Sequence, residues 1–113
     1  MATVSSEIRD DFDAKGYTVW EGFISRSHAQ ELRDLVLDMA KFERDAGDSY
    51  FYPFDSEGLT QRVWNLTNKS VRFRELLEIE ALSEMMDHIF QRPTHHQLFH
   101  LSSFQANILY PGA

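Results

Sequence analysis

The sequence predicts an α+β fold within a single domain, residues 1–113. The chain of 113 residues is long enough for one domain with a buried core and too short for two. Apolar residues recur at helical spacing between Ala29 and Ala40, whereas segments 17–24 and 104–110 are rich in the aromatic and β-branched residues that favour strands. A hydrophobic fraction of 42% and a charged fraction of 26% are typical of a globular protein with a packed core.

A short amphipathic helix is expected near the N-terminus. Ser5 or Ser6 can cap its first turn, because a serine hydroxyl accepts a hydrogen bond from a backbone N–H there. Ile8 and Phe12 lie four residues apart and therefore share one face. Gly16 is suited to end the helix, because glycine adopts the left-handed conformation at little cost.

A strand over residues 17–24 and a long helix are expected next. Ser25 or Ser27 opens this helix, which carries its apolar residues from Ala29 to Ala40 on one side and charged residues on the other. Segment 47–58 then breaks the helical pattern with turn-forming residues at both ends. It is predicted either to cover the long helix or to form a lid over a hydrophobic substrate, because it contains the aromatic residues Tyr50, Phe51, Tyr52 and Phe54.

The second half of the chain is expected to begin with a short extended piece, residues 61–66. A helix over 71–77 follows, with Asn68 or Ser70 as its cap, and a further helix runs from about residue 81 to residue 90. Both helices carry apolar residues at helical spacing.

Two strands are expected at the C-terminal end, over residues 95–101 and 104–110, after Pro93 closes the preceding helix. In the second strand the alternation of side chains places Gln105, Asn107 and Leu109 on one face and Phe104, Ala106, Ile108 and Tyr110 on the other. That strand ends three residues before the sequence does, which leaves its edge without a following neighbour. We therefore expect the chain to be the first part of a longer fold.

Composition excludes several classes of function. With 18 acidic and 11 basic residues the net charge is -7, which repels both nucleic acid and anionic membrane surfaces. The absence of cysteine excludes disulfides, zinc fingers and thiol nucleophiles. The sequence contains neither a signal-peptide pattern nor an apolar stretch of membrane-spanning length, so a cytoplasmic location is predicted.

Four stretches of the chain carry a resemblance to a known family. They are Phe12–Val19, Gly22–Ser25, Gln61–Leu66 and Phe104–Ala113. The resemblance depends on the order and spacing of the four stretches rather than on any one of them. Together they resemble the N-terminal half of the phytanoyl-CoA dioxygenase family, whose members are iron(II)- and 2-oxoglutarate-dependent oxygenases. The resemblance implies a complete fold of about eight strands in a double-stranded β-helix, or jelly roll, of which this chain holds the helical shell and the first strands.

The same resemblance implies where iron binds in the complete protein. In the family two histidines and one carboxylate hold the metal, and a His-x-Asp pair follows the strand that ends in Pro-Gly. None of the five histidines here has an acidic residue two positions later, so no metal ligand and no catalytic residue is expected within this chain. We expect Fe(II) and 2-oxoglutarate to act in the complete protein, on a small-molecule substrate, and the 113-residue chain alone to turn over nothing.

Four residues are candidates for the cosubstrate pocket by this resemblance. Arg62 matches a position where family members place a basic residue that reaches 2-oxoglutarate, and a guanidinium can form two parallel hydrogen bonds with a carboxylate. Asn107 lies at a family position that lines the cosubstrate site, and Gln105 shares its face on a regular strand. Trp64 is a candidate for the wall of the substrate pocket.

Each of these residues also has a purely structural interpretation. Arg62 can pair with an acidic neighbour such as Glu57 on the surface. Gln105 and Asn107 can be ordinary polar residues on the solvent side of a strand, and Trp64 can serve the core.

The histidines His95, His96 and His100 form the densest group of metal-ligating side chains. On a strand only His96 and His100 would share a face, and no carboxylate is close in sequence, so a fortuitous cluster is favoured over a metal site. His28 and His88 are expected on the surface of helices.

Two functions of different classes therefore remain open. The chain is either the N-terminal segment of an Fe(II)/2-oxoglutarate-dependent dioxygenase or a non-catalytic α+β interaction module derived from the same family. In the second case the exposed strand edge would bind a partner or allow self-association.

Overall fold

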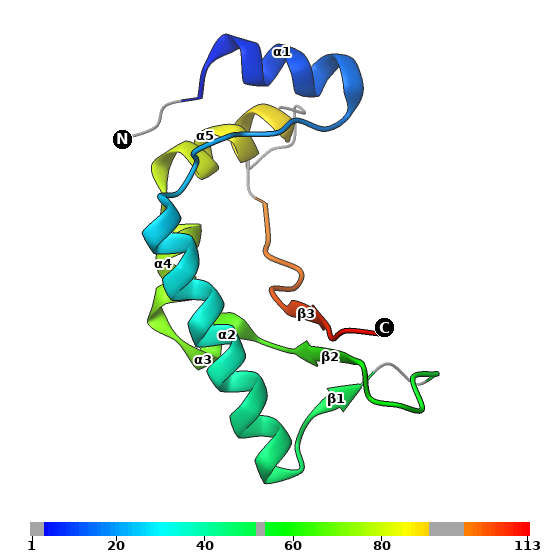
Figure 1. Cartoon of the computed structure of the whole chain (residues 1–113). Coiled ribbons are helices and arrows are strands. Elements are labelled where there is room, and N and C mark those ends of the chain that lie inside the picture. Colours follow the sequence, from blue (N-terminus) through cyan, green and yellow to red (C-terminus); the bar gives the residue numbers. More distant parts are fainter. Residues whose placement is uncertain (1–3, 52–53, 91–98) are drawn as a thin grey trace.

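The computed structural model describes residues 4–51, 54–90 and 99–113, and in these ranges the chain is a mixed α+β structure (Figure 1). Helices and strands follow one another in the order α1, α2, β1, β2, α3, α4, α5 and β3. The strands form a small antiparallel sheet in the order β1-β2-β3. The coarse fold class is therefore the one that the sequence predicts.

Helix α1 (Ser6–Lys15) has the predicted caps. The Ser5 hydroxyl accepts a hydrogen bond from the Ile8 N–H at 3.3 Å. Gly16 ends the helix in the left-handed conformation, with φ of 81°, and its N–H donates to the Phe12 carbonyl at 2.7 Å.

The predicted strand over residues 17–24 is wrong. This segment is a connection between two helices that belongs to no strand of the sheet, and Gly22 makes a turn within it at φ of 69°. Trp20 and Phe23 turn inward instead, with ring centroids 5.0 Å apart, and pack against the cluster around Met85. Aromatic and β-branched composition predicts a strand only where a neighbouring strand is available to pair with it, and no strand of the described ranges pairs with this segment.

Helix α2 (Arg26–Ala46) is the predicted long helix and continues to Ala46. The Ser25 hydroxyl accepts a hydrogen bond from the His28 N–H at 3.1 Å, and Gly47 ends the helix with φ of 77°. Leu32 and Ala40 are its buried residues.

The sheet consists of β1 (Tyr50–Phe51), β2 (Thr60–Val63) and β3 (Ala106–Leu109). In β2 the side chains of Gln61 and Val63 are fully buried against α2, whereas those of Thr60 and Arg62 point to the other face. Ala106 and Ile108 of β3 are half-buried and pack on the same core, as the predicted alternation requires. The predicted strand 104–110 is thus confirmed over its central four residues.

The other strand predicted at this end, over residues 95–101, is not present in its described part, because residues 99–101 form no strand. The first residues of that segment lie outside the described ranges, as do Tyr52, Pro53 and Pro93. Segment 47–58, predicted as a cover or a lid, contributes β1 to the sheet.

Three helices follow β2. Helix α3 (Leu66–Lys69) was not expected, and the chain enters it through Asn65, which adopts the left-handed conformation with φ of 54°. Helix α4 (Val71–Leu77) has the predicted cap, because the Ser70 hydroxyl accepts a hydrogen bond from the Arg72 N–H at 3.2 Å. Helix α5 (Glu80–Ile89) agrees closely with the predicted range.

Two hydrophobic clusters lie at opposite ends of the molecule. The sheet cluster joins α2, α3, α4 and the sheet, and its buried residues are Leu32, Ala40, Val63, Leu66 and Phe73. The helix cluster joins α1 and α5, and its buried residues are Val4, Ala81 and Met85. Figure 1 shows α1 and α5 together at one end, the sheet at the other, and α2 running between them.

The molecule is less compact than a typical domain of its length. Its radius of gyration is 16.9 Å, whereas a compact domain of about 100 residues has a radius of gyration near 13 Å. The chain therefore exposes to solvent some surface that a compact domain of the same length would bury. Among the described residues, no helix combines the length and the apolar character needed to cross a bilayer.

Candidate functional site

A row of three side chains crosses the sheet on the face that points away from α2. Arg62 of β2 lies directly opposite Tyr50 of β1 on one side and Asn107 of β3 on the other. Because directly opposed residues of antiparallel strands point to the same face, these three side chains are neighbours. We call this surface, which carries Tyr50, Arg62 and Asn107, the open face.

The Arg62 side chain is held beside two aromatic rings. Its guanidinium carbon lies 5.9 Å from the centroid of the Tyr50 ring and 6.0 Å from that of Trp64. The two rings contact each other edge to face, with centroids 5.4 Å apart, and each of these side chains is 39% exposed. A cation beside two aromatic rings gains from their quadrupoles and loses freedom of rotation, so the guanidinium is positioned before any ligand arrives.

Asn107 is oriented by Gln105 from the same strand face. The Gln105 amide donates a hydrogen bond to Asn107 Oδ1 at 3.2 Å. With its oxygen engaged in this way, the Asn107 amide nitrogen is the group that remains to donate to a ligand. A hollow of about 310 Å³ lies beside these residues and is lined by Thr60, Gln61, Arg62, Asn107, Ile108 and Leu109.

The open face has the donors that recognise a carboxylate. A guanidinium offers a planar fork of N–H donors, and a neighbouring carboxamide adds one more in almost any direction. Arg62 is the charged residue among those that line the hollow, although the chain as a whole carries a net charge of -7. The local charge and the donor set both favour a small anion.

The structure brings all four predicted site residues together. Arg62 lies opposite Asn107, Gln105 hydrogen-bonds to Asn107, and Trp64 lies against Arg62. Sequence reasoning missed the place of Tyr50 in this group. The aromatic character of segment 47–58 was the available signal, but only the register of β1 against β2 shows that Tyr50 faces Arg62.

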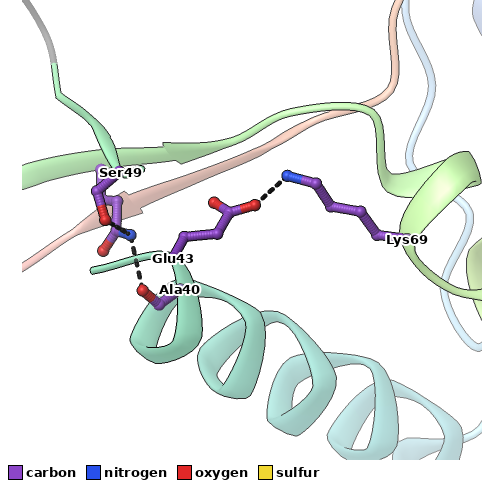
Figure 2. Close-up of polar contacts among 5 residues, drawn as sticks. Ala40, Glu43, Ser49 and Lys69 are labelled. Carbon is purple, nitrogen blue, oxygen red and sulfur yellow. Dashed lines mark hydrogen bonds and ion pairs between the residues drawn. The ribbon is translucent and has the colours of Figure 1, made fainter. Parts of the chain in front are cut away.

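The opposite face of β2 is fixed by one buried amide. Gln61 is fully buried, and its amide nitrogen donates hydrogen bonds to the Ala40 carbonyl and the Ser49 hydroxyl, both at 3.0 Å (Figure 2). Its carbonyl oxygen accepts from Arg44 at 3.3 Å and from the Tyr110 hydroxyl at 2.6 Å. One side chain thus ties α2, the segment before β1 and the end of the chain to the strand that carries Arg62.

Two further contacts support the same region. An ion pair joins Glu43 of α2 to Lys69 of α3, so that the loop after β2 is tied to the long helix (Figure 2). The Arg44 guanidinium carbon lies 5.2 Å from the Phe51 ring centroid and 4.8 Å from that of Tyr110. These contacts hold both edge strands in place around β2.

The turn into β2 depends on a carboxylate. Asp55 Oδ2 accepts hydrogen bonds from the Thr60 N–H at 2.5 Å and from the Thr60 hydroxyl at 2.8 Å. These bonds, led by the one from the backbone, lower the pKa of Asp55 below its usual value of 3.8. Because the folded-state pKa is the lower one, the stability that Asp55 contributes is present above 3.8 and is lost as the pH falls through the folded value.

We expect the substitution Asp55→Asn to flatten the loss of stability in acid. An asparagine can still accept the Thr60 hydrogen bonds but does not titrate in this range. The measurement is denaturant unfolding at a series of pH values between about 6 and 2. Asp10→Asn, on the exposed side of α1, is the matched control and should keep the wild-type slope. An unchanged slope in Asp55→Asn would show that this carboxylate is not linked to folding.

The described residues contain no group of three side chains of the metal-ligating kinds His, Cys, Asp and Glu that could hold a metal ion. His28 lies in the first turn of α2, and His88 of α5 shares a hydrogen bond of 2.8 Å with Asp13 of α1. His100 is exposed, whereas His95 and His96 lie outside the described ranges. The described residues therefore do not fit the iron that the family resemblance implies.

Comparisons with known proteins add no assignment. A scan against protein-family models found no match, and searches of curated proteins and of solved structures found none either. The resemblance to the phytanoyl-CoA dioxygenase family therefore stays a prediction from the sequence.

Proposed function

We propose that this chain is the N-terminal segment of an Fe(II)/2-oxoglutarate-dependent dioxygenase of the phytanoyl-CoA dioxygenase type, acting on a small organic molecule. In this proposal α1 to α5 are the helical shell and β1 to β3 are the first strands of a double-stranded β-helix. The observation that carries it is the pairing of Arg62 with Asn107 on the open face. This pairing supports a role in carboxylate binding, because it places two suitable donors side by side.

In this function the open face binds one carboxylate of 2-oxoglutarate. Arg62 supplies the positive charge and a fork of N–H donors, and Asn107 supplies an amide donor held in place by Gln105. Trp64 and Tyr50 form the wall beside the guanidinium and limit its contact with water, which strengthens its attraction for an anion. These residues bind and orient a cosubstrate, and none of them is assigned a catalytic role.

Iron would supply the oxidative chemistry of such an enzyme, and the described residues contain no group of three metal-ligating side chains that could hold it. In this proposal the described residues bind, position and shield the cosubstrate.

A binding experiment tests this proposal on the chain itself. We expect 2-oxoglutarate to shift the amide signals of Arg62, Trp64 and Asn107 in a nuclear magnetic resonance titration. Arg62→Gln should weaken this binding by about tenfold or more, because one charge-assisted interaction with a carboxylate contributes on the order of 1.5–3 kcal/mol. Arg62→Lys should have an intermediate effect, because it keeps the charge and loses the fork.

Arg74→Gln is the matched control, because Arg74 lies on the exposed surface of α4 and its guanidinium donates to the Thr67 carbonyl, away from the open face. It should leave 2-oxoglutarate binding unchanged. Equal affinity of the wild type and Arg62→Gln, or signal shifts confined to residues away from the sheet, would contradict the proposal.

A second candidate function is supported by the position of β3 at the end of the sheet. β3 pairs with β2 on one side, and no described residue pairs with its other side. An unpaired strand edge is a site where an extended segment can add to a sheet. In this function the chain is a non-catalytic interaction module, and its partner binds along β3.

A further inference from the structure

The outer edge of β3 presents regularly spaced backbone groups. Tyr110 N–H donates to the Leu59 carbonyl at 2.8 Å, so Ile108 and Ala106, two and four residues earlier, form the hydrogen-bonded pairs with β2. The N–H and C=O groups of Asn107 and Leu109 therefore point away from β2. They are the groups to which an added strand would bond.

An apolar hollow of about 500 Å³ runs along this same edge. It is lined by residues of α2, by Ile24 and Phe73, and by Asn107, Ile108 and Leu109 of β3. No residue of β2 lines it, so it lies on the side of β3 that faces away from the rest of the sheet. Side chains of an added strand that point to the α2 side would enter this hollow beside Ile108.

The charged side chains beside the edge of β3 indicate which kind of strand can bind there. Arg33 is the charged residue that lines the apolar hollow, and Arg62 is the one that lines the hollow on the other side of β3. An added strand in which acidic residues alternate with apolar ones turns all its acidic side chains to one face, and on the open face these lie on the side of the positively charged Arg62. A second copy of this chain offers no such charge along its own edge, because β3 reads Ala-Asn-Ile-Leu and contains no acidic residue.

We propose that the edge of β3 and the α2 hollow bind an extended peptide in which apolar residues alternate with acidic ones. This inference rests on the second function above and names its partner by chemistry. Apolar side chains of the peptide fill the hollow lined by Leu32 and Val36, and its acidic side chains lie beside Asn107 on the open face. Its backbone pairs with Asn107 and Leu109.

The probe is a blocked seven-residue peptide, Thr-Val-Glu-Val-Glu-Val-Thr, titrated into the chain and followed by calorimetry. Replacing both glutamates of the peptide by lysine should weaken binding at least about tenfold, because the charge complementarity is reversed. N-methylation of the backbone at both glutamates should weaken it by a similar factor, because these residues donate to the edge of β3.

Substitutions in the chain complete the test. Leu109→Pro removes an N–H that points away from β2, a position where proline is tolerated, and should weaken binding about tenfold. Leu109→Ala is the matched control: it removes the same exposed side chain, keeps the N–H and should stay within about twofold of wild type. The N-methylated peptide leaves the protein and its open face unchanged, so its weaker binding separates this inference from the dioxygenase proposal.

Three results would overturn the inference. The first is that the glutamate peptide does not bind, and the second is that the N-methylated peptide binds as tightly as the unmodified one. The third is a concentration-dependent dimer that Leu109→Pro abolishes, because it would assign the edge of β3 to a second copy of the chain. The N-methylated peptide keeps the test decisive even if Leu109→Pro does not fold.

Discussion

Replacing Phe73 by alanine is expected to lower the free energy of unfolding by about 3–5 kcal/mol. Phe73 is 4% exposed and sits in the sheet cluster, where α4 meets α2 and the segment leading into β3. Its ring contacts that of Phe104 edge to face, with centroids 5.8 Å apart. The truncation removes this contact and leaves a cavity between the helices and the sheet, and both effects reduce stability.

Denaturant unfolding followed by circular dichroism measures this effect. Phe42→Ala is the matched control, because Phe42 is also a phenylalanine within a helix but is 75% exposed. The control should change the free energy of unfolding by no more than about 0.5 kcal/mol. Similar losses in the two variants would show that the sheet cluster is not the main source of stability.

Gln61→Met is expected to cost about 2–3 kcal/mol of stability. Methionine has nearly the same shape as glutamine, so the substitution tests the hydrogen bonds rather than the packing. It leaves the Tyr110 hydroxyl and the Ser49 hydroxyl without the partner that both have in the wild type. A polar group in a poorly solvated position that loses its partner destabilises the fold by more than the bond itself contributes.

Thermal and denaturant unfolding of Gln61→Met would be compared with Gln30→Met, in which an exposed glutamine of α2 is replaced. The control should lie within about 0.5 kcal/mol of wild type. The Gln61 variant should in addition lose part of its 2-oxoglutarate affinity, because β2 also carries Arg62 on its other face. A Gln61 variant as stable as the control would rule out the buried amide as the anchor of β2.

Local signals in the sequence predicted the helices well. Ser5, Ser25 and Ser70 cap helices where expected, and Gly16 ends α1, because capping depends on residues within one turn of each other. The strands were harder to predict. Segment 17–24 has the composition of a strand, but pairing is decided by distant residues, and the two-residue β1 is too short to give a pattern.

The sequence predicted which residues belong to the candidate site but not how they lie relative to one another. The alternation along residues 104–110 placed Gln105 and Asn107 on one face, and the structure agrees. That Arg62 lies opposite Asn107 is a matter of register between strands more than forty residues apart in sequence, which no local pattern encodes. The same holds for Gln61, whose four partners come from three distant segments.

The separation of the two hydrophobic clusters means that the protein need not open all at once. Among the described residues none is common to the two clusters, and the chain crosses between them three times: near Phe23 and Ile24, between Leu76 and Ile79, and between Ile89 and Phe104. Fluctuations that release α1 and α5 can therefore leave the sheet and its anchored strands intact. Backbone amides at the α1 end would then exchange with solvent through partial unfolding. Those around Val63 would exchange only through the rarer global unfolding of the chain.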